Sequence, residues 1–347
     1  MKKFIVLFTV VALVLASLVS CGTPKTTESD SLSLDNSAES TAENTNDSET
    51  LKVGVIQYVS HPSLDNCYAG VEAALKEHYG DKVEITRQIG SDSSPDSDCS
   101  TYAKQFAAQN YDILIPIATP AASSAFAAAE DKDIPVVFCA VSDPVSVGLA
   151  ESLDKPGYNC SGTSDVLDMD AQINLITALA PDTAKIGVLY TTSEANSIAQ
   201  LALLEAAAAK KNIEIVASGI QNDADIPAAA AALAAKVDCI NNFTDNKVVN
   251  NLTVVLDAAN NAGIPVYGSE IEQVKNGCLA SVSIDYVALG KVTGEMAIEA
   301  LDGAKLADMA VRTISDATPV INTEVLERFE MSIPEGFENA EKVVTNK

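Results

Sequence analysis

The sequence contains no tryptophan, only two histidines and more than twice as many acidic as basic residues. Its net charge of −26 repels phosphate groups and argues against nucleic-acid binding. We find no G-x-S-x-G, Walker, G-x-G-x-x-G or H-E-x-x-H motif and no Cys/His spacing typical of zinc. His61 is the only candidate general base, because His78 falls inside a predicted helix. We therefore expect a protein that is not an enzyme and that uses neither a metal nor a cofactor.

The N-terminal segment resembles a bacterial lipoprotein signal. Lys2 and Lys3 form a positive region, an apolar run follows from Phe4 to Ala16, and small residues precede Cys21. A membrane-spanning anchor is the weaker alternative, because a spanning helix needs ~20 apolar residues. The resemblance implies that residues 1–20 are a signal peptide and that Cys21 carries a diacylglyceryl group. The protein would then be lipid-anchored on the outer face of the cytoplasmic membrane.

Two segments of different composition follow this signal. Residues 21–50 are rich in Ser, Thr and acidic residues and cannot bury enough apolar surface to fold, so we expect a disordered tether. The remaining chain, from Leu51 to Lys347, is too long for a single core and predicts two lobes.

Short apolar runs alternate with alanine-rich stretches along this body, which is typical of strands and crossover helices in a parallel sheet. The pattern occurs twice, because Lys52-Val53-Gly54-Val55-Ile56 resembles Lys185-Ile186-Gly187-Val188-Leu189, and Ile134-Pro135-Val136-Val137 resembles Ile264-Pro265-Val266-Tyr267. We therefore predict an α/β protein with two similar lobes. The predicted strands are Leu51–Tyr58, Lys82–Gln88, Asp112–Ile117, Ile134–Ala140, Lys185–Tyr190, Ile213–Ser218, Val237–Asn241 and Ile264–Gly268. The predicted helices are Leu64–Tyr79, Asp96–Gln109, Ala121–Ala129, Met169–Leu179, Ala195–Lys210, Pro227–Ala235 and Lys247–Asn260.

Polar side chains follow the predicted strands. Parallel sheets bind ligands at the carboxyl ends of their strands, and two facing sheets would place both edges on one cleft. The segments at these edges are rich in hydroxyl, amide and carboxylate groups. The candidate ligand-binding residues in them are Gln57, Thr119, Asp143, Ser193, Asn196, Ser197, Thr244, Asp245 and Ser269.

Helix starts among these residues suit the carboxylate of a small ligand. Ser193, Asn196 and Ser197 begin a predicted helix, and Thr119 begins one in the facing lobe. Free backbone N–H groups and the positive end of the helix dipole attract an anion there. Ordinary helix capping explains any single one of these residues equally well.

Carboxylates and aromatic rings supply the other half of an amino-acid site. Asp143 and Asp245 could compensate a partly desolvated ammonium, although each could also be a cap or a turn residue. Tyr58 and Phe243 flank the same segments and could pack against a flat side chain, or belong to the core. Together these groups suit a zwitterion.

Six cysteines remain beyond the signal. Cys67 and Cys99 are the candidate disulfide pair, because both lie near the starts of predicted helices of one lobe. The alternative is that all six are small buried apolar residues.

An ordered series of motifs extends from about Leu51 to about Pro334. It comprises Lys52-Val53-Gly54-Val55-Ile56-Gln57 with His61-Pro62-Ser63-Leu64-Asp65, Ile117-Ala118-Thr119-Pro120-Ala121-Ala122, Ala140-Val141-Ser142-Asp143-Pro144-Val145, Gly162-Thr163-Ser164-Asp165, Ile186-Gly187-Val188-Leu189-Tyr190 with Ser193-Glu194-Ala195-Asn196-Ser197, Thr244-Asp245-Asn246, and Ile284-Asp285-Tyr286 with Leu289-Gly290 and Thr293-Gly294-Glu295-Met296-Ala297. With these motifs the chain resembles the type I periplasmic-binding-protein-like substrate-binding lipoproteins of ABC importers related to the tryptophan and tyrosine transporters.

The resemblance implies two Rossmann-like lobes with parallel sheets joined by hinge strands. It assigns residues 51–162 and 282–304 to lobe 1, 163–281 and 305–335 to lobe 2, and 336–347 to a C-terminal tail. It further implies a monomer that delivers its ligand to an ABC permease and its ATPase. The cleft would be lined by Thr119, Asp143, Ser193, Asn196, Ser197, Thr244 and Asp245.

We therefore predict an extracytoplasmic binding protein of an ABC importer for an aromatic amino acid, namely tryptophan, tyrosine or phenylalanine. A sugar or another polyol is an alternative ligand, disfavoured because sugar sites commonly stack on tryptophan. A surface adhesin or ligand-sensing receptor is a second alternative, since the tether suits it equally well. An exported hydrolase that uses His61 is the weakest alternative.

Overall fold

The computed structural model describes residues 50–314 and 317–346. The predicted signal peptide, the predicted lipidation site Cys21 and the expected tether up to residue 49 lie outside the described residues. In the part of the chain that is described, no helix combines the length and the apolar character that crossing a membrane requires.

Two parallel sheets define two lobes, as predicted. The sheet of lobe 1 has the strand order β11-β5-β4-β3-β1-β2 and that of lobe 2 the order β7-β6-β8-β9. The first four strands of each half therefore occupy equivalent places. The strands are β1 (Leu51–Gln57), β2 (Val83–Ile89), β3 (Ile113–Ile117), β4 (Val136–Phe138), β5 (Cys160–Ser164), β6 (Lys185–Thr191), β7 (Glu214–Ile220), β8 (Cys239–Asn241), β9 (Val266–Tyr267) and β11 (Arg312–Thr313).

A third, smaller sheet packs with lobe 2. It has the order β10-β12-β13, with β10 (Ala280–Ser283) antiparallel to β12 (Thr318–Asn322) and β13 (Glu341–Val343) parallel to β12. The backbone N–H of Gly268, just after β9, donates to the carbonyl of Ala280 in β10. The chain thus leaves lobe 1 after β5, returns to it after β10, and leaves it again between β11 and β12.

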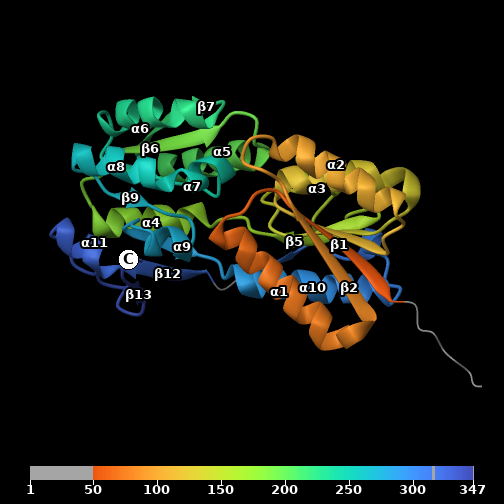
Figure 1. The fold of residues 1–347 in the computed structure, drawn as a ribbon. Helices are drawn as coiled ribbons and strands as arrows, with labels where there is room; N and C mark the ends of the chain where they lie inside the picture. Colours follow the sequence, from red (N-terminus) through yellow and green to blue (C-terminus); the bar gives the residue numbers. More distant parts are fainter. Residues whose placement is uncertain (1–49, 315–316, 347) are drawn as a thin grey trace, which may run out of the picture. The chain divides into compact units, whose positions relative to one another are not determined.

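Helices cover both faces of each main sheet (Figure 1). In lobe 1, α2 and α3 pack together on one face and α1 and α10 on the other, whereas lobe 2 pairs α6 with α8 and α4 with α5. The helices are α1 (Pro62–Tyr79), α2 (Pro95–Ala108), α3 (Thr119–Ala129), α4 (Met169–Leu179), α5 (Ala195–Ala209), α6 (Ile226–Ala234), α7 (Asn246–Asn250), α8 (Leu252–Ala262), α9 (Ile271–Lys275), α10 (Tyr286–Leu301) and α11 (Thr323–Arg328).

The repeated strand motif has a packing reason. A Cβ atom on Gly54 in β1 would lie 2.6 Å from the Phe106 ring of α2, and one on Gly187 in β6 would lie 2.9 Å from Leu233 of α6. Glycine at the same place in both strands therefore lets a helix approach each sheet closely.

Three domain assignments differ from those that the resemblance implied. Residues 305–313 lie on lobe 1 rather than lobe 2, because β11 pairs with β5 and the Ser161 hydroxyl donates to the carbonyl of Met309 at 2.7 Å. Lobe 1 also continues to Ser164, the end of β5. The expected tail at 336–347 instead contributes β13 to the third sheet. The predicted helix Lys247–Asn260 is two helices, which meet at Asn251.

The proposed Cys67–Cys99 disulfide is absent. All six cysteines of the described chain are free and buried. The Cys99 thiol donates to the carbonyl of Gln57, while Cys67 contacts Cys139 and burial raises the pKa of the Cys67 thiol. The alternative interpretation, small buried residues of the core, describes them correctly.

Candidate functional site

A narrow pocket lies between the lobes, at the carboxyl ends of strands from both sheets. Its lobe 1 wall comes from the segments after β1, β3, β4 and β5 and from the start of α10. Its lobe 2 wall comes from α5, α7 and α9. The residues used below are His61, Ala118, Thr119, Ala140, Ser142, Asp165 and Tyr286 on the first wall and Asn196, Thr244, Asn246 and Gln273 on the second.

Hydrogen bonds hold the two walls together. Nε2 of Gln200 in α5 donates to the Ser142 hydroxyl at 2.9 Å and to the Thr244 hydroxyl at 2.6 Å. Oε1 of Gln200 accepts from the backbone N–H of Thr244. Nε2 of His61 lies 3.3 Å from Oδ1 of Asn246. Because His61 and Ser142 belong to lobe 1 and their partners to lobe 2, the described arrangement is a closed one.

Two alanines on the lobe 1 wall have strained backbones. Ala118, after β3, has φ 80° and Ala140, after β4, has φ 57°. A residue other than glycine pays of order 1–3 kcal/mol in such regions, and such strain is concentrated at functional sites. Both methyl groups are small, so the wall between them leaves space in the pocket.

Thr119 begins α3 beside Ala118. Its hydroxyl is buried and has no hydrogen-bond partner among the described residues. The first turn of any helix also has backbone N–H groups without intrahelical acceptors. Pro120 has no N–H and the N–H of Ala122 donates to the carbonyl of Ala118, so this part of the wall offers the Thr119 hydroxyl and the N–H groups of Thr119 and Ala121.

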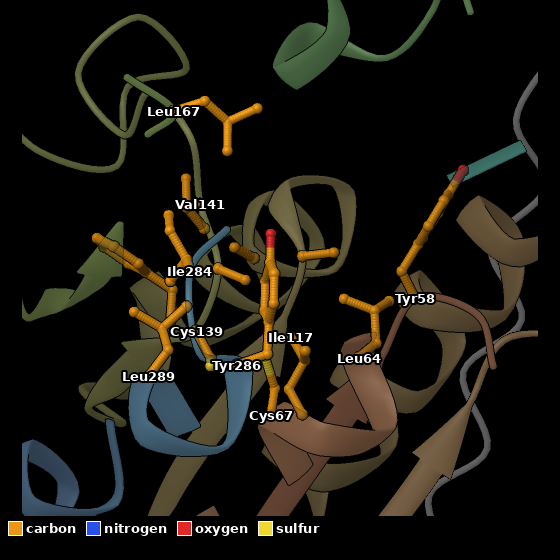
Figure 2. Close-up of a cluster of buried hydrophobic side chains, with 14 of the residues drawn as sticks. Tyr58, Leu64, Cys67, Ile117, Cys139, Val141, Leu167, Ile284, Tyr286 and Leu289 are labelled. Carbon is orange, nitrogen blue, oxygen red and sulfur yellow. The ribbon is translucent and has the colours of Figure 1, made fainter. Parts of the chain in front are cut away.

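Among the described residues that line this pocket, Asp165 is the only one with a carboxylate. It is buried, and it accepts hydrogen bonds from the Ser142 hydroxyl at 2.9 Å and the Tyr286 hydroxyl at 3.0 Å. Burial raises the pKa of Asp165, because neither partner carries a positive charge. Figure 2 shows the Tyr286 ring standing over Cys67 and Cys139 with its hydroxyl pointing away from the sulfurs.

A second buried carboxylate lies behind the lobe 2 wall. Oε2 of Glu194 accepts from the Asn246 side chain at 2.7 Å, from the Asn246 backbone N–H at 3.1 Å and from Asn196 at 3.1 Å. Burial, together with the nearby Asp245, raises the pKa of Glu194 to about 7. Its other oxygen, Oε1, and Oδ1 of Asn196 have no partner in the described chain.

The structure brings three of the predicted ligand-binding residues into the pocket: Thr119, Asn196 and Thr244. Two others, Ser197 and Asp245, lie directly behind it. Asp245 is the N-cap of α7 and accepts from Val248, from Ser197 and from both the N–H and the hydroxyl of Thr191. Its hydrogen-bonding capacity is therefore taken up by the protein.

The other predicted residues lie elsewhere. Asp143 closes a turn with the N–H of Ser146, and Ser193 is exposed. Gln57 is buried within lobe 1, where it bonds Asp65 and Arg87, and the Ser269 hydroxyl donates to the carbonyl of Asn242.

Neither predicted aromatic residue contributes to the pocket. Phe243 is fully buried in the core. Tyr58 lines a neighbouring cavity between the lobes. Phe243 therefore packs in the core at a strand end, the alternative that the sequence left open, whereas Tyr58 lies beside the pocket without lining it.

Several residues of the site were not among the candidates. Asp165 follows β5 and Tyr286 follows β10, two strands that the hydrophobic pattern did not predict. Both residues fall within motifs of the family resemblance, which was the available signal. Nothing in the sequence indicated a role for Gln200 in the site, because it lies one turn into α5 and resembles any polar residue of a helix.

Comparison with known proteins agrees with this architecture. The family model described as "ABC transporter substrate binding protein" matches residues 52–344. A tyrosine-binding protein of Clostridioides difficile (strain R20291) is 39% identical over 282 residues, which are 80% of this chain and 81% of that protein.

Solved structures show the same relationship. A protein of Streptococcus pneumoniae in complex with L-Trp has a TM-score of 0.81 and 35% identity, covering 85% of this chain and 100% of that one. The ligand-free, open structure of a substrate-binding protein with adhesive properties from Clostridium difficile has 36% identity and the same coverage, but a TM-score of only 0.66. The better match to the complex is consistent with the hydrogen bonds that close the lobes. By sequence and by fold, the chain belongs to the family of ABC transporter substrate-binding proteins.

Proposed function

We propose that this protein captures an aromatic L-amino acid outside the cytoplasmic membrane and delivers it to an ABC permease. The relatives named above support this ligand class, because one is a tyrosine-binding protein and another was solved with L-Trp. The lipobox-like sequence before Cys21 supports a lipid anchor, the family resemblance supports a monomer, and the motifs missing from the sequence support binding without a cofactor.

The buried carboxylate of Asp165 is the observation that carries the proposal. It lines the pocket and has hydrogen bonds only from the neutral hydroxyls of Ser142 and Tyr286. No ion pair of the described chain involves it. A buried carboxylate of this kind is stabilised by a cation, and the ammonium group of an amino acid would supply one.

The start of α3 provides for the opposite charge. The unpaired Thr119 hydroxyl and the N–H groups of the first turn are hydrogen-bond donors at the positive end of a helix dipole. An α-carboxylate bound there would leave the ammonium free to reach toward Asp165. Ala118 and Ala140 line the pocket with small apolar side chains beside these groups.

A calorimetric screen with two matched variants tests the proposal. Wild-type protein is titrated with each proteinogenic amino acid and with myo-inositol and glucose. We expect heat only from aromatic amino acids. Asp165→Asn should weaken binding about 100-fold, since loss of one partner of a buried charge pair costs roughly 2–5 kcal/mol.

Asp143→Asn is the matched control, because Asp143 lies in the neighbouring segment but outside the pocket. It should bind like the wild type. Heat from a polyol, together with none from any amino acid, would overturn the proposed function.

A further inference from the structure

His61 has an unpaired ring nitrogen at the proposed ligand site. The side chain lines the pocket, and the residue is only 8% exposed. Nδ1 has no hydrogen-bond partner among the described residues, whereas Nε2 contacts Oδ1 of Asn246 across the cleft. The chemistry available at Nδ1 depends on which of the two nitrogens carries the proton.

Glu194 settles that question through Asn246. Three donors surround Oε2 of Glu194, and one is the backbone N–H of Asn246, which can only donate. When Glu194 is ionised, Oε2 accepts from all three donors, and Nδ2 of Asn246 therefore points at it. Oδ1 of Asn246 then faces His61 and can only accept. His61 consequently carries its proton on Nε2.

The remaining nitrogen of His61 is therefore an acceptor. Burial lowers the pKa of His61 to about 4, so the ring is neutral near pH 7 and Nδ1 keeps a free lone pair. A buried acceptor without a partner costs roughly 1–3 kcal/mol, which a donor on a bound ligand would recover.

The position of His61 distinguishes between the donors that an amino acid offers. His61 follows β1 and Asp165 follows β5, and β3 and β4 lie between them in the sheet. Neighbouring parallel strands are ~4.8 Å apart, so these strand ends are roughly 14 Å apart. The two acceptors therefore follow well-separated strands of the lobe 1 sheet, and an ammonium group held by Asp165 leaves Nδ1 of His61 to another donor of the ligand. Ala118 and Ala140, after β3 and β4, present small apolar side chains to the pocket between the two acceptors.

We propose that Nδ1 of His61 accepts a hydrogen bond from a donor on the ring of the bound amino acid, so that the site prefers tyrosine and tryptophan to phenylalanine. The shared chemistry is a ring-borne donor, a phenol O–H or an indole N–H. This inference rests on the proposed function and names the feature of the ligand that the site recognises.

Calorimetry with L-tyrosine, L-tryptophan, L-phenylalanine and 4-fluoro-L-phenylalanine tests the inference on the unaltered protein. The fluoro compound has nearly the shape of tyrosine but no donor. We expect tyrosine, tryptophan or both to bind at least about tenfold more tightly than the two ligands without a ring donor. The ratio between tyrosine and tryptophan tells which donor the site uses. Equal affinities for all four ligands would overturn the inference and leave the proposed function standing.

The variant His61→Leu locates the effect. Loss of the Asn246 contact weakens closure on every ligand alike, so the affinity for the preferred ligand should fall about tenfold more than the affinity for phenylalanine. His78→Leu is the matched control, because His78 lies near the end of α1 with about half of its side chain exposed. An equal loss for all four ligands in His61→Leu would contradict the inference. Failure of the wild type to bind any amino acid would instead reject the proposed function.

Discussion

Lobe 1 and lobe 2 share a strand order but contribute to the pocket differently. Thr119 and Asp245 follow the third strand of their halves, β3 and β8, and stand at the start of a helix. Thr119 lines the pocket and its hydroxyl has no partner in the described chain, whereas the Asp245 carboxylate accepts hydrogen bonds from described residues of lobe 2 alone. The neutral residue is therefore available to a ligand, and the charged residue stabilises the fold.

This difference shows that residue type alone does not identify a binding group. Two carboxylates behind the lobe 2 wall, Glu194 and Asp245, bond protein donors, while the carboxylate at the pocket belongs to the hinge segment after β5. The number of donors already around each carboxylate separates the two roles.

The largest expected effect separates Asp245 from Thr119. Asp245→Ala would leave buried hydrogen-bond donors of Thr191 and Ser197 without an acceptor. We therefore expect it to lower the free energy of unfolding of the ligand-free protein by about 3–4 kcal/mol. Thr119→Val should change it by less than about 1 kcal/mol, because the hydroxyl has no partner to lose. Urea denaturation measures both. An unchanged midpoint for Asp245→Ala combined with lost ligand binding would restore the role that the sequence suggested.

A smaller effect is expected in the pH dependence of stability. Burial raises the pKa of Glu194 to about 7, so its contribution is fully present below pH ~4.5 and is lost as the pH rises to 7. Burial lowers the pKa of His61 to about 4, so its contribution grows as the pH rises from 4 to about 6.5. These two groups, joined through Asn246, oppose each other.

Glu194→Gln removes one side of this opposition. Between pH 4.5 and 6.5, the stability of the variant should rise with pH more steeply than that of the wild type, by up to ~1.4 kcal/mol per pH unit. Urea denaturation across this range measures the slope. Glu205→Gln, at an exposed position of the same helix, is the control and should follow the wild type. If the stability of Glu194→Gln and that of the wild type changed with pH in parallel, Glu194 would have the same pKa in the folded and the unfolded protein.

The smallest effect concerns the strained alanines of lobe 1. Ala118→Gly and Ala140→Gly relieve positive φ angles, and we expect each to stabilise the ligand-free protein by about 0.5–1 kcal/mol. Ala122→Gly, in the interior of α3, should instead destabilise it by about 1 kcal/mol. Thermal denaturation compares the three. A loss of stability at all three positions would mean that the positive φ angles store no strain.

The sequence predicted the eight strands of the two repeated halves because they are apolar runs between turn-forming residues. It did not predict β5 or β10, although both are buried, since Cys160–Ser164 and Ala280–Ser283 consist largely of small polar residues. Their hydroxyls are satisfied by tertiary partners, such as Thr293 for Thr163. The hydrophobic pattern along the chain does not indicate such partners, because they are distant in the sequence.

The site was only partly predictable for a similar reason. The rule that ligands bind at the carboxyl ends of strands located Thr119, Asn196 and Thr244. It could not separate Asp143 from Asp165, because the choice depends on which segment turns toward the facing lobe. Nor could the sequence show that Cys67 contacts Cys139 rather than the predicted partner Cys99, since this contact joins α1 to the end of β4.

The hydrogen bond between Tyr286 and Asp165 spans two of the places where the chain changes lobes. Asp165 follows β5, on the way out of lobe 1, and Tyr286 follows β10, on the way back. A ligand whose ammonium group binds Asp165 would therefore affect both of these interlobe connections. Ligand binding would then alter the flexibility of the connections between the lobes. The residence time of the ligand and the rate at which the lobes reopen would both depend on the hydrogen bond between Tyr286 and Asp165.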